Sequence, residues 1–233
     1  MKNALLIAWR EIRWEIFGDR SAVLRMGVFA VLPIAFVLTN RAARANDLTL
    51  FTLALQSVLF PALSGVALIA STFTQEKENG TLIPLLASPV RDIDIVVGKL
   101  VGMILPVFAL CVASVALYFG LVSAQYGVAR VALALPLGLL YALVVLALLY
   151  LLTAGSWVLI VAALVKTSRA GQQIAGLLIG LSVVLFTGLG FAAANIADGW
   201  ALVGLGVALL GSDVAALEIA RRAWRREEVL ARL

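Results

Sequence analysis

Residues 100–122 read LVGMILPVFALCVASVALYFGLV, a stretch without a single charged side chain. About 20 apolar residues in a helix are enough to cross the hydrocarbon core of a bilayer. Similar apolar runs recur along the chain, which is 63% hydrophobic and only 13% charged over 233 residues. The sequence therefore predicts an all-α, polytopic membrane protein and argues against a soluble enzyme.

Six membrane-spanning helices are predicted from these runs. Their ranges are Ala22–Thr39, Leu50–Phe73, Leu100–Val122, a segment within Val131–Val165, Ile174–Ala194 and Trp200–Ala220. The fourth run is too long for a simple span, because its uncharged residues would measure about 52 Å as one straight helix. We expect one long helix that is broken near Gly155 and Ser156, while a hairpin is the alternative that the charge pattern disfavours.

The placement of Lys and Arg predicts the orientation. Fifteen of the 18 basic residues fall in the N-terminal segment, in two connections and in the tail, whereas Arg41, Arg44 and Arg130 fall on the opposite side. Loops rich in Lys and Arg stay in the cytoplasm. We therefore expect both termini to be cytoplasmic and the protein to lie in the cytoplasmic (inner) membrane.

The N-terminal segment, residues 1–20, differs from the spans. Apolar residues recur at helical spacing between Leu5 and Phe17, and charged residues occupy the other faces. This pattern is typical of an amphipathic helix that lies in the membrane interface, with Trp9 and Trp14 at the depth of the headgroups. The alternative is an ordinary basic flank of the first span.

Composition also limits the chemistry. The chain has no His and one Cys, Cys111. Zinc sites, non-haem iron sites and Ser-His-Asp triads use imidazoles or clustered thiols. We therefore predict no catalytic residue, no metal site and no cofactor bound directly to this chain.

The connection between the second and third spans, residues 74–99, carries the most specific pattern: TQEKENGTLIPLLASPVRDIDIVVGK. Gly80 favours a turn, Thr81 an N-cap, and Pro89 a stop, so a helix of about two turns is predicted between them. Its leucines share one face. Such a helix at a cytoplasmic surface is expected to bind a partner, and the alternative is that its leucines lie in lipid.

This connection resembles that of the permeases of ABC type-2 transporters, in which an acidic pair precedes Gly-Thr-Leu, a Leu-rich helix, a Ser/Pro pair and a Gly-Lys that opens the third span. The matching residues are Glu76, Glu78, Gly80, Thr81, Leu82, Leu85, Leu86, Ser88, Pro89, Val90, Gly98 and Lys99, and the N-terminal elbow helix matches at Trp9, Arg10 and Glu11. Two departures are the replacement of the usual Glu after Gly-Thr-Leu by Ile83, and a connection, Asn195–Gly199, that is too short for external re-entrant helices.

The resemblance implies a transmembrane permease subunit of an exporter, with an elbow helix over residues 1–20, six helices over residues 21–220 and a basic cytoplasmic tail over residues 221–233. The helix around Leu82 would be the coupling helix that docks on a separate cytosolic ATP-binding-cassette ATPase, where ATP and Mg bind. A second permease copy would complete the unit. The chain itself has no phosphate-binding Gly-x-x-x-x-Gly-Lys-[Ser/Thr] motif. A hydrophobic or amphipathic cargo is expected, with haem as one option, although no His is available as an axial ligand.

Two other classes remain as alternatives: an ion-coupled secondary transporter and a membrane scaffold. Ion-coupled carriers keep ionisable residues within their spans, and Asp213 is the one candidate here. We expect Asp213, after Gly211 and Ser212, to cap a cytoplasmic amphipathic helix that holds Leu217 and Trp224.

Small residues in the fifth span, Gly176 and Gly180, predict close helix packing. A path for cargo would be lined by apolar residues and by small hydroxyls, namely those of Ser57, Ser64, Thr153 and Ser156.

Overall fold

The computed structural model describes residues 2–13, 47–78, 90–135, 137–164 and 200–223, together with isolated positions between residues 24 and 35 and between residues 173 and 184. Every regular element in these ranges is a helix, so the all-α prediction is confirmed for them. The helices are α1 (Lys2–Glu11), α3 (Asp47–Glu78), α5 (Asp92–Tyr126), α6 (Val128–Ala134), α7 (Leu137–Leu164) and α9 (Trp200–Ala223).

Three of these helices are long and apolar enough to cross a membrane. Their apolar segments are Thr49–Ala70 in α3, Asp94–Tyr126 in α5 and Gly138–Val158 in α7, and α9 carries a shorter one, Gly206–Ala216. The helices satisfy their own backbone hydrogen bonds, as a lipid environment requires. The predicted second, third, fourth and sixth spans thus coincide with α3, α5, α7 and α9, whereas most of the first and fifth spans lies outside the described residues.

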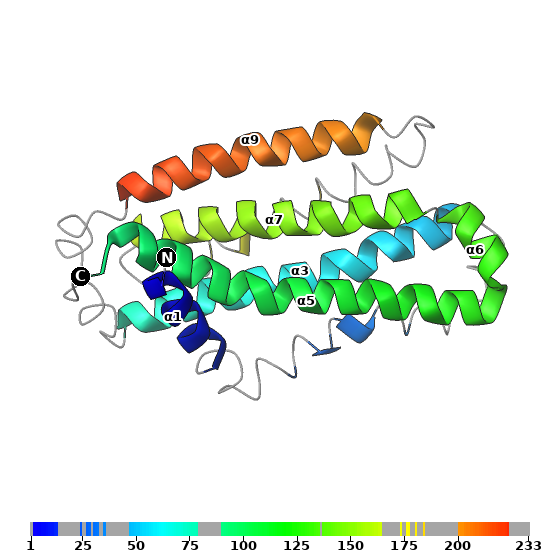
Figure 1. The fold of residues 1–233 in the computed structure, drawn as a ribbon, viewed down its shortest axis with the longest axis horizontal. Coiled ribbons are helices and arrows are strands. Elements are labelled where there is room, and N and C mark those ends of the chain that lie inside the picture. The colour runs from blue at the N-terminus through cyan, green and yellow to red at the C-terminus, as the bar shows by residue number, and fades with distance from the viewer. Residues whose placement is uncertain are drawn as a thin grey trace.

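The three long helices α3, α5 and α7 form the core of the bundle, and two further helices are added to it (Figure 1). Helix α9 packs along α7, and the short helix α1 crosses the beginning of α5. We call the end of the bundle that holds α1, the last turns of α3 and the first turns of α5 the α1 end. The opposite end, where α6 joins α5 to α7, is the α6 end.

Two residues interrupt the helical conformation at the α6 end. Gly127 has a φ of +88°, a conformation that favours glycine, and it separates α5 from α6. Leu135 leaves the helical region with a φ of −129° and a ψ of 77°, because the residue before a proline disfavours the helical conformation. Helix α7 then runs unbroken from Leu137 to Leu164. The break that we expected near Gly155 and Ser156 was therefore wrong, and a hairpin within α7 is excluded.

Close approach of helices occurs at glycines of α3, α5 and α7. A Cβ atom on Gly65 would overlap Val107 Cγ1, and one on Gly155 would lie 3.2 Å from Leu100 Cδ2. Nothing lies within 4 Å of the corresponding positions on Gly176 and Gly180. Among the described residues, close glycine packing is therefore found in the three-helix core and not at the predicted pair.

Asp213 does not cap a helix. Helix α9 is continuous from Trp200 to Ala223 and passes through Gly211, Ser212 and Asp213 without a break. The predicted cap was wrong because Asp213 has a hydrogen-bonding partner on another helix: its Oδ1 atom lies 2.6 Å from Thr153 Oγ1 of α7.

Candidate functional site at the junction of helices α1 and α5

The predicted coupling connection lies at the α1 end. Helix α3 extends to Glu78, so that Glu76 and Glu78 lie in its last turns, and α5 begins at Asp92. The centre of the connection lies outside the described residues, and it includes Gly80, Thr81, Leu82, Leu85, Leu86 and Pro89. Val90 is half-buried just before α5. The described part of the connection therefore consists of its two helical ends.

A buried ion pair joins the two other predicted motifs. Lys99 Nζ donates a hydrogen bond to Glu11 Oε1 over 3.2 Å, and both side chains are 0% exposed. Lys99 lies in the second turn of α5, and Glu11 is the last residue of α1. Burying two charges is costly unless each is paired, so the pair fixes the position of α1 on the beginning of α5.

Arg10 adds a second cation to this pair. Its Nη2 atom donates to the same Glu11 Oε1 atom over 3.0 Å, and its side chain is 50% exposed. Glu11 therefore receives donors from one buried and one partly solvated cation. Its other oxygen, Oε2, is buried without a hydrogen-bond partner among the described residues.

Backbone packing reinforces the ion pair one turn further along α5. A Cβ atom on Gly102 would lie 2.8 Å from the carbonyl oxygen of Ala8 and 2.9 Å from Glu11 Cβ. Real Cβ atoms do not approach backbone so closely, so α1 can lie here only because residue 102 is a glycine. Ile7, Ala8 and Glu11 form the buried face of α1.

The opposite face of α1 is apolar and exposed. Leu5, Leu6 and Trp9 are all largely exposed, although they are large hydrophobic side chains. A helix with one face on protein and an unburied apolar face is typical of helices at a membrane interface. An interfacial elbow helix over residues 1–20 stays a prediction.

The first half of α5 packs against both other helices of the core, α3 and α7. Leu100 and Ile104 pack on Gly155 of α7, and Val107 packs on Gly65 of α3. Further along α5, Tyr118 donates a hydrogen bond to the Leu50 carbonyl over 2.7 Å, and Ser114 donates to the Ala30 carbonyl over 2.9 Å. A displacement of the beginning of α5 therefore acts directly on α1, α3 and α7.

The predicted hydroxyls of a cargo path are used within the bundle. Ser57 donates to the carbonyl of Ala54, and Ser64 donates to the carbonyl of Pro61. Thr153 bonds its own helix and α9, while Ser156 is buried. The hydroxyls of Ser57, Ser64 and Thr153 therefore all have hydrogen-bond acceptors within the bundle.

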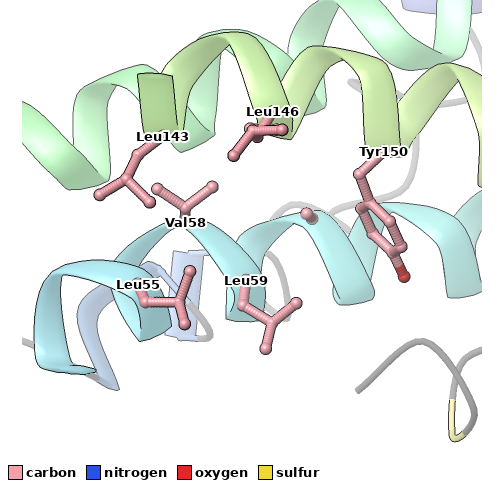
Figure 2. A pocket seen from close by; sticks show the side chains of 8 residues that line it. Leu55, Val58, Leu59, Leu143, Leu146 and Tyr150 are labelled. Atoms are coloured by element: carbon pink, nitrogen blue, oxygen red, sulfur yellow. The ribbon is translucent and has the colours of Figure 1, made fainter. Parts of the chain in front are cut away.

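A small apolar crevice lies between α3 and α7 (Figure 2). Leu55, Val58 and Leu59 of α3 face Leu143, Leu146 and Tyr150 of α7, and Ala62 and Ala147 complete the lining. Its cavity volume is only about 10 Å³. The crevice is too small for a cargo molecule.

The sequence named Glu11 and Lys99 as members of separate motifs and did not predict that they pair. Two signals pointed that way: Lys99 directly precedes the uncharged run of residues 100–122, and its charge is opposite to that of Glu11. A partner 88 positions away cannot be chosen from those signals alone.

Comparisons with known proteins agree with the fold. A family model described as "ABC-2 family transporter protein" matches residues 28–206. A comparison with curated proteins found no match. The matched residues include α3, α5, α6 and α7 in full, and Lys99 lies among them, whereas α1 with Glu11 precedes them. Because this match covers more than half of the chain, the chain belongs to the ABC-2 family of transporter proteins, whose members are membrane transport components.

Proposed function

We propose that this chain is the permease subunit of an ABC exporter that moves a hydrophobic or amphipathic cargo across the cytoplasmic membrane. Energy comes from ATP, which binds with Mg on a separate cytosolic ATPase subunit. Two permease copies and two ATPase subunits form the working unit. Membership of the ABC-2 family supports the permease function and the ATPase partner.

One observation carries the mechanism: α1 is anchored to α5 directly after the segment predicted to dock on the ATPase. Lys99 and Gly102, which hold α1, lie within the first three turns of α5. A force that the ATPase subunit exerts on residues 79–91 would therefore displace α5 and α1 together. Since Leu100, Ile104 and Val107 pack on α7 and α3, the same force reaches the helices that would open and close a path.

The distribution of charge supports the orientation. Within the described helices, the charged residues of α1, the end of α3, the beginning of α5 and the end of α9 lie at the α1 end, and only Asp47 and Arg130 lie near the α6 end (Figure 1). The positive-inside rule then puts the α1 end in the cytoplasm, where an ATPase subunit would meet it. We therefore propose six spans with both termini cytoplasmic.

Cysteine labelling in a Cys111-free background tests this topology. Cysteines at positions 45 and 127 are expected to react from outside the cell, and those at positions 79, 168 and 228 only after the membrane is opened. An outside reaction at position 228 would contradict the orientation.

The docking segment is tested with Leu85→Asp. An unpaired charge in an apolar interface is strongly penalised, so this variant should insert normally and fail to retain the ATPase subunit on purification. Leu133→Asp is the matched control, because Leu133 is exposed on α6 at the other end of the bundle. Glu76→Lys and Glu78→Lys should slow assembly and change its salt dependence, as peripheral charges act mainly on association.

Three results would decide between functions. Normal ATPase retention and ATP-dependent transport by Leu85→Asp would place the docking site elsewhere. Transport that survives loss of the ATPase subunit but stops with the ion gradient would identify an ion-coupled carrier. A chain that retains no ATPase and transports nothing would be a scaffold.

A further inference from the structure

Asp213 occupies a part of the bundle where a charge is costly. It lies within the apolar segment Gly206–Ala216 of α9 and is only 7% exposed. Val207, Leu210 and Val214 of the same helix are exposed large hydrophobic residues, which suits contact with lipid. An ionised carboxyl at this depth is expected to have a cation or several donors beside it.

The actual partners of Asp213 are few and neutral. Its Oδ1 atom lies 2.6 Å from Thr153 Oγ1 of α7, and the neighbouring Ser212 hydroxyl accepts a hydrogen bond from Trp157 Nε1 over 3.2 Å. Together these contacts form two polar links between α7 and α9. The Oδ2 atom of Asp213 is buried with no hydrogen-bond partner in the described part of the chain.

The protons at this site can be counted. The Thr153 hydroxyl has one proton, and its oxygen lies within hydrogen-bonding distance of two acceptors, the Leu149 carbonyl at 2.9 Å and Asp213 Oδ1 at 2.6 Å. If Thr153 donates to Leu149, the shorter contact needs a proton from Asp213. We propose that Asp213 binds a proton inside the membrane and, as a neutral carboxylic acid, donates it to Thr153 Oγ1.

The neutral acid also accounts for the unpartnered oxygen. A carboxylate that accepts one hydrogen bond in a low dielectric pays a large desolvation cost. In the neutral acid, Oδ2 is a carbonyl oxygen, for which a missing donor costs much less than for an anion.

No described cation compensates a charge on Asp213. Helix α7, its main neighbour, has no charged residue between Leu137 and Leu164, and its ionisable groups are Tyr141 and Tyr150. On α5 the charged residues are Asp92, Asp94 and Lys99, and Lys99 is paired with Glu11. On α9 itself, Glu218 has the same sign as ionised Asp213, and Arg221, the nearer of Arg221 and Arg222, lies eight residues, or about 12 Å, further along the helix.

A metal cation does not fit the same contacts. Ligand oxygens lie about 2.3–2.6 Å from a bound Ca²⁺, and two ligands of one ion stand further apart than the 2.6 Å between Asp213 Oδ1 and Thr153 Oγ1. A contact of that length is typical of two oxygens that share a proton. Among the described residues no group of three His, Cys, Asp or Glu side chains gathers to hold a metal.

Infrared difference spectroscopy on the full chain in lipid membranes tests the proposal without any transport assay. The spectrum of wild type minus Asp213→Asn is recorded at neutral pH, which is far above the pKa of about 3.9 of an exposed Asp. It should nevertheless contain the carbonyl band of a protonated acid. Carboxylate bands in its place would overturn the proposal. In Thr153→Val the acid band should persist and move to the frequency of an acid without an acceptor, and an unmoved band would overturn the proposed bond.

Stability gives an independent readout. Asp213→Asn is neutral and of the same shape, so it should unfold at the wild-type temperature. A strongly lowered temperature for Asp213→Asn, equal to that of Asp213→Ala, would show that the negative charge is needed and would overturn the proposal. Because neither readout depends on ATP or cargo, the proposal can fail while the proposed transport function stands.

Discussion

Two helices are added to the same three-helix core, and they are attached by different chemistry. Helix α1 is held to α5 by the Glu11–Lys99 ion pair and by backbone contact at Gly102. Helix α9 is held to α7 by links among uncharged Thr, Ser and Trp side chains and Asp213. Unlike Gly102 at the α1–α5 junction, two glycines on α9, Gly204 and Gly211, have open space where a Cβ would be.

The difference follows the position of each contact along the bundle. The α1–α5 junction lies at the charged end, where Arg10 reaches solvent and still contacts Glu11. The α7–α9 contact lies between apolar segments of both helices. Ions are tolerated near water and avoided at depth, so the first contact uses charge and the second is expected to use a neutral acid.

The largest effect is expected for Lys99→Met. This change leaves Glu11 buried with one cation fewer, and breaking a buried ion pair from one side costs about 3–5 kcal/mol. The free energy of unfolding in detergent measures the loss. The double variant Glu11→Gln/Lys99→Met should recover most of it, because no buried charge remains. A double variant as unstable as the single one would show that the loss of the pair itself, and not the undercompensated charge of Glu11, destabilises the contact of α1.

Gly102→Ala should have the next largest effect. The new methyl group meets the backbone of Ala8, which cannot rotate away, and overpacking of this kind costs about 1–3 kcal/mol. Gly120→Ala on the same helix is the control, since nothing lies within 4 Å of its Cβ position. Equal stability of the two variants would mean that α1 can shift on α5, and the junction would then be a weaker contact than the α7–α9 one.

Tyr118→Phe gives a reference value for one neutral hydrogen bond within the core. It removes the donor to the Leu50 carbonyl, which should lower stability by about 1 kcal/mol. Tyr141→Phe on the exposed surface of α7 should have no measurable effect. A larger loss for Tyr141 than for Tyr118 would contradict the observed partners.

Trp157→Phe is expected to have the smallest effect. It removes the indole donor to Ser212 and keeps an aromatic ring, and single interhelical hydrogen bonds in membranes contribute about 0.6 kcal/mol. The separation of α7 and α9, measured by crosslinking of engineered cysteines, should change little. Complete detachment of α9 would show that this link, rather than Asp213, holds the two helices together.

The candidate site was predictable in part. The Gly-Lys at residues 98–99 and the Trp-Arg-Glu at residues 9–11 stood out as motifs, and helices were expected at both places. The break of the fourth run was predicted at Gly155 and Ser156 but lies at Leu135, because Gly155 is accommodated by Leu100 and Ile104 of a neighbouring helix while Pro136 restricts the backbone of Leu135 locally. The restriction that Pro136 puts on the backbone thus decided where the helix was interrupted. Packing against α5 explains why the helix continues through Gly155.

The sequence alone determined the class of this protein, the approximate extent of four helices and the end at which charge gathers. Length, hydropathy and charge are properties of a segment by itself, so they need no knowledge of its neighbours. Only the tertiary structure decided that Glu11 meets Lys99, that Gly102 admits α1, and that Asp213 faces Thr153 rather than capping a helix. The physical reason is that lipid and a neighbouring helix are equally apolar. An apolar face therefore does not say which of the two it will contact, and the partners of its few polar groups depend on how the helices cross.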